Sequence, residues 1–212
     1  MLLMGNSQSE HIDFEKETNS MTKKFWNEDK YLYNHVNKQY ENRGTVNLDT
    51  VIPILGNIFN NFNKKINILE VGSGNGFNTK LIYNNLSKYI DELKATDIQI
   101  HSPSYFKIEK LKSHDAVYKY GKDIDILMLI SPPCIGFMDY YAIKTYELLN
   151  SDKDKYVIYI GELGASDGAT GMYKYMMEES EWNLIKSVEF SETMLMYGEY
   201  CVKEVFLFKW KK

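Results

Sequence analysis

The stretch Ile68–Gly76 reads ILEVGSGNG: an apolar run, an acidic residue within it, and then three glycines at alternate positions. A short apolar run that ends in glycines is typical of a buried strand. Glycine adopts backbone angles that other residues avoid, and it lets another molecule approach the main chain closely. A turn of this kind at the carboxyl end of a parallel strand is where open α/β sheets bind ligands. We therefore expect a strand, a ligand-binding turn and a helix.

The glycine spacing separates two classes of ligand. A dinucleotide fingerprint places its third glycine three residues after the second, whereas Gly76 follows Gly74 by two. The charge of Glu70 would repel a pyrophosphate but suits a ligand that carries an ammonium and a sulfonium. The stretch resembles motif I of the S-adenosylmethionine-dependent methyltransferases, which implies that Glu70, Gly72, Gly74 and Gly76 bind this cofactor. A glycine turn without a ligand is the alternative.

The rest of the chain alternates strands and helices, which predicts a largely parallel sheet with helices on both faces. We expect seven strands, at 66–71, 93–97, 106–111, 124–130, 156–160, 184–190 and 202–210. We expect helices at 78–90, 138–149 and 172–179. No helix separates the last two strands, so they must pair antiparallel. This doubly wound, mostly parallel seven-stranded sheet with a terminal hairpin resembles the Rossmann-like fold of class I methyltransferases.

Two further acidic residues extend the predicted cofactor site. Asp97 ends the second strand, where a carboxylate can accept hydrogen bonds from both ribose hydroxyls of an adenosine. A turn-capping aspartate is the alternative at this position. The run His114-Asp115-Ala116 resembles a third motif of the family, in which the aspartate meets the adenine amino group. A helix N-cap is the alternative for Asp115.

The fourth predicted strand ends in Ser131-Pro132-Pro133-Cys134. This is similar to the Asp/Asn/Ser-Pro-Pro-aromatic motif of methyltransferases that act on planar amino nitrogens. The resemblance implies that the Ser131 side chain and the Pro132 carbonyl accept the two N–H bonds and orient the nitrogen. Two prolines stiffen the turn, which lowers the entropy lost in holding that geometry. A rigid turn without a direct role in chemistry is the alternative.

Cys134 departs from the motif, because an aromatic residue there would stack on the target. Phe137, Tyr140 and Tyr141 follow closely and are candidates to replace that stacking. Beyond the fifth strand, the glycine-rich segment Gly161–Gly171 is predicted to be a mobile lid, a site of close ligand approach or a surface connection. Glu162 within it is a candidate polar group of the substrate pocket.

The Pro-Pro turn, the Tyr-Ile-Gly-Glu strand end, the glycine-rich segment and Trp182 together resemble a set of uncharacterised methyltransferase-like proteins. That closer resemblance covers about residues 66 to 210 and implies no substrate.

The region before the first strand has no glycine motif. We expect a mobile leader over 1–22, a helical segment over 23–62 packed on the core, and the cofactor-binding domain over 63–212. We expect helices over 25–42 and 47–61 in the second region, and Arg43 lies between them. It is a candidate partner for the cofactor carboxylate, although a solvated arginine is the alternative.

The amino-acid composition indicates which classes of binding partner are not expected for this protein. The net charge of −4 lacks the basic excess that is typical of nucleic-acid-binding proteins, and acids interrupt the lysines at 107–112. Cys134 and Cys201 have no zinc-ligand spacing, so we expect no metal and reduced thiols. No membrane span or secretory signal is visible, which predicts a cytoplasmic protein.

The residues together favour an S-adenosylmethionine-dependent methyltransferase with an unidentified acceptor. A noncatalytic relative, retained as a cofactor sensor or interaction partner, is the alternative from another class. A nucleic-acid-binding module is a third hypothesis.

Overall fold

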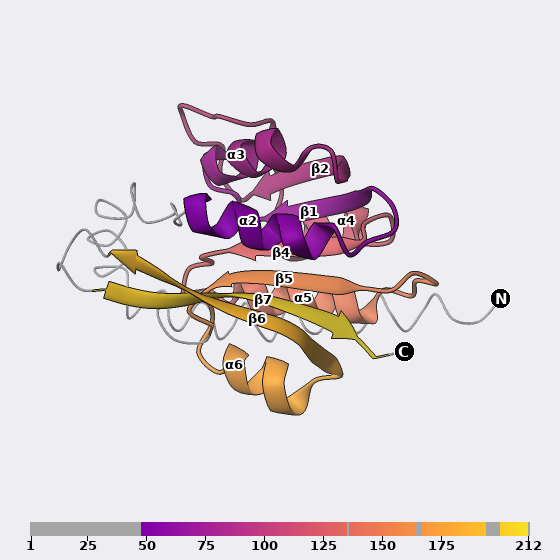
Figure 1. The fold of residues 1–212 in the computed structure, drawn as a ribbon. Helices are drawn as coiled ribbons and strands as arrows, with labels where there is room; N and C mark the ends of the chain where they lie inside the picture. Colours follow the sequence, from indigo (N-terminus) through magenta and orange to yellow (C-terminus); the bar gives the residue numbers. More distant parts are fainter. Residues whose placement is uncertain (1–47, 135, 164–166, 194–199, 212) are drawn as a thin grey trace, which may run out of the picture. The chain divides into compact units, whose positions relative to one another are not determined.

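The computed structural model describes residues 48–134, 136–163, 167–193 and 200–211. The chain divides into two units, Met1–Arg43 and Gly44–Lys212, and all described residues belong to the second. Its centre is a seven-stranded sheet in the order β3-β2-β1-β4-β5-β7-β6 (Figure 1). The strands are β1 (Ile66–Val71), β2 (Ile90–Asp97), β3 (Ile108–Lys110), β4 (Ile126–Ile130), β5 (Tyr156–Gly161), β6 (Trp182–Thr193) and β7 (Tyr200–Trp210).

The sheet is parallel except at one side. Strands β1 to β5 pair parallel with their neighbours. Strand β7 pairs antiparallel with β5 and with β6, so the last strand lies inside the sheet and β6 forms the edge. These pairings confirm the predicted doubly wound, mostly parallel sheet that ends in an antiparallel hairpin.

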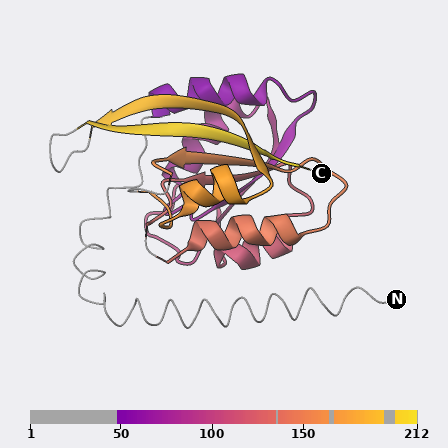
Figure 2. The same cartoon turned by 90° about the horizontal axis from the view of Figure 1, so that it is seen from below.

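Helices cover both faces of the sheet, as Figure 2 shows. Helices α2 and α3 lie on one face, and α4, α5 and the α6–η1 segment lie on the other. Their bounds are α2 (Leu48–Phe59), α3 (Phe77–Leu86), α4 (Ser113–Tyr120), α5 (Met138–Leu148), α6 (Met172–Lys174) and η1 (Tyr175–Glu179).

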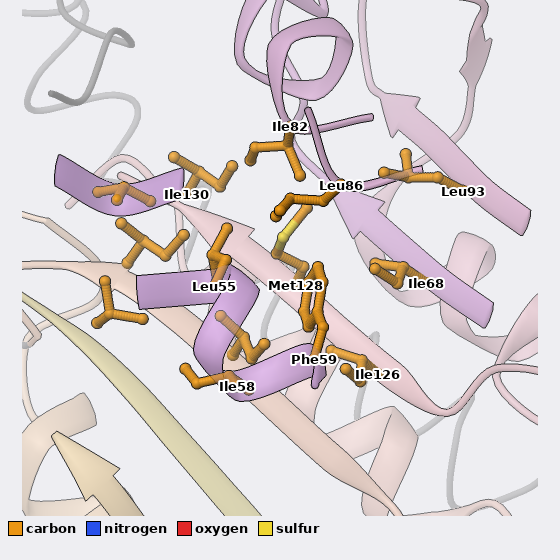
Figure 3. Packing of buried hydrophobic residues seen from close by; sticks show 14 of the residues in the cluster. Leu55, Ile58, Phe59, Ile68, Ile82, Leu86, Leu93, Ile126, Met128 and Ile130 are labelled. Carbon is orange, nitrogen blue, oxygen red and sulfur yellow. The ribbon is translucent and has the colours of Figure 1, made fainter. Parts of the chain in front are cut away.

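Alternation along the central strands divides the core into two layers. In β4, Ile126 and Met128 pack with Leu55 of α2 in one cluster (Figure 3). Leu127 and Leu129 point to the opposite face and pack beneath α4 and α5. All five residues of β4 are buried, as expected for a strand covered by helices on both faces.

Several predicted boundaries were wrong. The helix expected over 78–90 ends at Leu86, because Ile90 instead pairs with Ile66 as the first residue of β2. The third strand has three residues rather than six. Helix α4 was not predicted, since its eight residues bury only Ala116 and Val117 and give a weak helical pattern.

The remaining elements match their predictions closely. The helices expected over 47–61 and 138–149 are α2 and α5. The helix expected over 172–179 is present, but it changes to π winding after Lys174, with Ser180 N–H donating to the Tyr175 carbonyl at 2.9 Å. The predicted helix over 25–42 and Arg43 lie outside the described residues. Within those residues, no helix combines the length and apolarity that crossing a bilayer requires.

Candidate functional site

The glycine turn lies between β1 and α3, at the carboxyl end of the sheet. Gly72, Gly74 and Gly76 all have positive φ, at 72°, 59° and 74°. At Gly76 a side chain is also excluded by contact, because a Cβ atom would lie 2.7 Å from Cβ of Phe106. At Gly74 a Cβ atom would meet no atom of the described residues within 4 Å. The turn is therefore closely packed against Phe106 at Gly76, whereas the space beside Gly74 is open.

Glu70 lies beneath this turn and is 1% exposed. Its Oε2 atom is buried and has no hydrogen-bond partner among the described residues. Burial raises the pKa of the Glu70 carboxyl to about 7, and the nearby charge of Asp97 acts in the same direction. The Thr79 hydroxyl is close enough to oppose the rise, although it does not reach full hydrogen-bond geometry. A buried, unsatisfied carboxylate is costly unless a donor or cation reaches it.

Asp97 connects the end of β2 to the same turn. Its Oδ2 accepts a hydrogen bond from the Gly74 N–H at 2.8 Å, and its Oδ1 accepts one from Gln99 N–H at 2.9 Å. Each carboxylate oxygen keeps a further lone pair for another donor. The turn is held from β2 as well, because Ser73 N–H donates to the Thr96 carbonyl at 3.0 Å.

The structure thus brings five of the six predicted cofactor-binding residues together: Glu70, Gly72, Gly74, Gly76 and Asp97. The sixth, Asp115, lies in the first turn of α4 and is not its N-cap, which is Lys112. The Asp115 side chain is half exposed, and its Oδ1 lies 3.5 Å from Nε2 of His114.

Sequence reasoning missed Ile98 beside this site. Ile98 directly follows Asp97 and is 60% exposed, so an apolar side chain lies next to the Asp97 carboxylate in the chain and is accessible to a ligand. The sequence could have indicated Ile98, because an apolar residue there directly follows the aspartate that ends the second predicted strand.

The Ser131–Pro132 turn follows β4, the neighbour of β1. Ser131 has φ of 41° and Phe137 has φ of 53°, and they are the two non-glycine residues with positive φ in the described part of the chain. Such backbone strain concentrates at functional sites. The glycine turn contacts the start of helix α5, which follows the Ser131–Pro132 turn in the chain, since a Cβ atom on Gly72 would lie 2.7 Å from the Met138 Cε.

A buried ion pair supports the Ser131 side chain, and sequence reasoning did not find it. Lys203 Nζ of β7 lies 3.1 Å from Asp167 Oδ2, with the two side chains 8% and 12% exposed. The same ammonium donates to Ser131 Oγ at 3.2 Å. Ser131, Asp167 and Lys203 are far apart in sequence, and only the insertion of β7 beside β5 brings them together.

Segment 167–169 is anchored to the same region. Gly168 N–H donates to the Pro132 carbonyl at 2.7 Å, and Ala169 N–H donates to Asp139 Oδ2 at 2.9 Å. Asp139 is fully buried at the start of α5, and burial raises the pKa of its carboxyl. Gly168 and Ala169 of the predicted glycine-rich segment are therefore hydrogen-bonded to the Ser-Pro-Pro turn and to helix α5. Residues 164–166 lie outside the described part.

The other residues that the sequence connected with the methyl acceptor do not form one cluster of mutual contacts among the described residues. Cys134 is half-buried and unpaired, and Glu162 donates its N–H to Asp167 Oδ2 at 3.0 Å. Tyr140 packs edge-to-face on Tyr175 with ring centroids 5.2 Å apart. Tyr141 makes a similar contact with His114, at 6.0 Å. Phe137, the N-cap of α5, is partly buried against the hydrophobic core.

The sequence matches no known family model and no curated protein. Solved structures are similar in fold. The 1,6-didemethyltoxoflavin-N1-methyltransferase of Burkholderia thailandensis, with bound 1,6-didemethyltoxoflavin and S-adenosylhomocysteine, is 10% identical, with 87% of each chain covered and a TM-score of 0.55. A proposed RNA methyltransferase from Pyrococcus horikoshii is 11% identical, with 76% of this chain and 80% of that chain covered and a TM-score of 0.51. The chain therefore has the Rossmann-like class I methyltransferase fold.

Proposed function

We propose that this protein is an S-adenosylmethionine-dependent methyltransferase. The observation that carries the proposal is the buried Glu70 carboxylate, which has an unpartnered oxygen beneath a glycine turn that is open at Gly74. An orphaned anion suits a ligand with an ammonium group, and the open glycine leaves room for that ligand against the main chain. The residues present thus fit the cofactor that this fold implies.

The chain's residues would divide the binding of the cofactor among them. Gly72, Gly74 and Gly76 would let it approach the backbone, and Glu70 would attract its cationic amino acid end. Asp97 would accept hydrogen bonds from the ribose hydroxyls through its remaining lone pairs. Ile98, exposed beside Asp97, would pack against the adenine ring and lose its contact with water. The cofactor supplies an electrophilic methyl group on a sulfonium.

We propose that the acceptor is a planar amino nitrogen held at the Ser131–Pro132 turn. The stiff double-proline turn and the strained Ser131 backbone support this role, since both fix the geometry before the acceptor binds. The Ser131 side chain and the Pro132 carbonyl would orient the acceptor nitrogen toward the methyl group that the bound cofactor would supply. The methylated nitrogen would then lose a proton to water. Positioning and exclusion of water would provide most of the acceleration.

The alternative is a noncatalytic protein that binds the cofactor as a sensor. The half-buried Cys134 favours it, because this position lacks the aromatic ring of the amino-methyltransferase motif. Cofactor affinity does not separate the two functions, since both require it. Production of S-adenosylhomocysteine in the presence of an acceptor does.

Calorimetric titration tests the cofactor assignment. We expect S-adenosylmethionine and S-adenosylhomocysteine to bind with higher affinity than NAD, because Glu70 repels a pyrophosphate. Equal affinity for NAD, or no binding of S-adenosylhomocysteine, would remove the proposal. Methyl uptake from labelled S-adenosylmethionine by nucleosides, RNA, peptides and small amines then tests turnover.

A further inference from the structure

Backbone N–H groups of the glycine turn donate to partners other than Glu70, although this carboxyl lies directly beneath the turn. Ser73 N–H donates to the Thr96 carbonyl at 3.0 Å. Gly74 N–H donates to Asp97 Oδ2 at 2.8 Å. These donors hold the turn against β2, so they do not compensate the buried carboxyl.

The neighbours of Glu70 in the fold do not offset a negative charge either. Glu70 is opposite Ala95 of β2 and Met128 of β4, which are both apolar. Thr79 of α3 is the polar side chain beside it and is 0% exposed. Among the described residues, the charged group that acts on Glu70 is Asp97, and its negative charge disfavours a second one. The site thus encloses a carboxyl group without a cation.

An enclosed carboxylate without a cation avoids the cost of desolvation by taking up a proton. Enclosure is accordingly the main cause that raises the pKa of Glu70 to about 7. A protonated carboxyl also gains an O–H donor, and the neighbouring Thr79 hydroxyl is able to accept from it. A ligand with an ammonium group reverses this balance, because a nearby cation favours the ionised form.

We propose that Glu70 releases a proton when the cofactor binds, so that cofactor affinity decreases as the solution becomes acidic. In mildly acidic solution the carboxyl of the free protein holds its proton. On binding, Glu70 exchanges its O–H bond for an ion pair with the ammonium group of the cofactor. The electron pair stays on the carboxylate, and the proton passes to water. This inference rests on the proposed function and concerns the protonation that accompanies binding.

The direction of the pH dependence follows from the two states of Glu70. Below the pKa of about 7 in the free protein, binding must expel a proton, so affinity rises with pH. Above that value the carboxylate is already ionised, and affinity levels off. Because the ion pair lowers the pKa in the complex, we expect affinity to rise about tenfold from pH 6 to pH 8. Binding should release about one proton at pH 6 and almost none at pH 8.

Calorimetric titration of the protein with S-adenosylhomocysteine at the two pH values measures both quantities. Titrations in buffers that differ in ionisation enthalpy give the number of protons released. The matched ligand is 5′-methylthioadenosine, which keeps the nucleoside and the sulfur but lacks the amino acid end with its ammonium group. We expect its affinity to change little with pH and its binding to release no proton.

Two substitutions assign the proton to its residue. Glu70→Gln keeps the size of the side chain but cannot ionise, so its affinity for S-adenosylhomocysteine should not change with pH and no proton should be released. His101→Gln is the control, because histidine is the other side-chain type that changes charge in this range, and His101 Nε2 lies 3.8 Å from Asp97 Oδ1. This variant should release the proton as the wild-type protein does.

The outcomes separate this inference from the function beneath it. Failure of S-adenosylhomocysteine to bind at either pH defeats the proposed function and the inference together. Binding with equal affinity at both pH values and no proton release overturns the inference alone. Release of the same proton by 5′-methylthioadenosine or by Glu70→Gln, or its loss in His101→Gln, also overturns the inference. If Glu70→Gln does not fold, the comparison of the two ligands on the wild-type protein still decides.

Discussion

At the scale of single residues, the two carboxylates near the glycine turn are in contrasting environments. Asp97 has both oxygens hydrogen-bonded to backbone N–H groups. Glu70 is enclosed by the fold, and its pKa is raised to about 7. One carboxylate is therefore satisfied by the protein, while the other is ionised at an energetic cost that a bound cation would offset.

Gly74→Asn should abolish binding of S-adenosylhomocysteine while leaving the fold intact. Asparagine tolerates the positive φ of this position. Its Cβ would meet no atom within 4 Å in the part of the chain that the structure describes, so its side chain would occupy the space proposed for the ligand. Calorimetry measures the loss, and circular dichroism checks the fold. Gly171→Asn is the control, because Gly171 also has positive φ and open space. Unchanged affinity in Gly74→Asn would contradict the assignment of the turn.

Asp97→Ala should weaken cofactor binding by about 1 to 3 kcal/mol, the range for losing charge-assisted hydrogen bonds. The substitution also removes the bond to Gly74 N–H, so the loss alone does not identify a ribose contact. A 2′-deoxy cofactor analogue separates the effects, since the variant should discriminate less than wild type between analogue and cofactor. Equal discrimination by both proteins would exclude Asp97 as the partner of that hydroxyl.

Glu70 predicts an unusual dependence of stability on pH. Its folded pKa of about 7 exceeds the value of 4.5 expected when unfolded. Between these values only the folded state holds the proton, so stability falls as pH rises from 4.5 to 7. The whole effect is at most about 3 kcal/mol. In urea unfolding, Glu70→Gln should lose less stability over this window, and a constant difference between the proteins would refute the prediction.

The glycine turn, Glu70 and Asp97 could be predicted because they are consecutive or end adjacent strands. The Lys203–Asp167 pair could not, since it depends on the register of β7 against β5, which the sequence pattern does not specify. Asp115 gave an ambiguous signal. It belongs to a short helix whose N-cap is three residues earlier.

At the scale of elements, the C-terminal end of helix α5 is stabilised by Lys155, the residue just before β5. Lys155 is buried, and its ammonium donates to the carbonyls of Tyr146 and Glu147 at 2.7 and 3.0 Å and to that of Leu149. These carbonyls end the helix without partners in its own ladder. The cation also lies at the negative end of the helix dipole.

Lys155→Met should therefore destabilise the protein by about 2 to 3 kcal/mol, because methionine fills similar space but leaves the carbonyls without a donor. Chemical denaturation measures the change. Lys122→Met, at an exposed position before β4, should change stability by less than about 0.5 kcal/mol. Similar effects from the two substitutions would show that the Lys155 contacts contribute nothing specific.

At the scale of the whole molecule, two properties of the sequence specify the architecture. The alternation of apolar runs with helical patterns predicted the parallel layers, and the absence of a helix before the last strand predicted the hairpin. The sequence pattern did not indicate that Ile90 would leave α3 to pair with Ile66, because helix and strand patterns overlap at that residue. The pairing of Ile90 with Ile66 determines that this residue is in a strand and not in the helix.

Cofactor binding should stabilise the whole described domain. S-adenosylhomocysteine at about 100 times its dissociation constant adds about 2.7 kcal/mol to the unfolding free energy if it binds only the folded state. For a domain of this size that corresponds to roughly 5 to 10 °C in melting temperature. A thermal scan with and without the ligand measures it. NAD at the same concentration is the control, and an equal rise with NAD would argue against selectivity.

The interior place of β7 has a consequence for biosynthesis. A ribosome releases β5 and β6 before residues 200–210, so during translation β5 has an unsatisfied edge and its buried side chains lack one neighbour. Pairing across such long sequence separation is slow, and an open apolar edge invites association with other nascent chains. Completion of the sheet and assembly of the Lys203 contact with Ser131 are therefore late, simultaneous events. A chain released before this point would have the complete glycine turn but would lack the Lys203 contact at the Ser131–Pro132 turn.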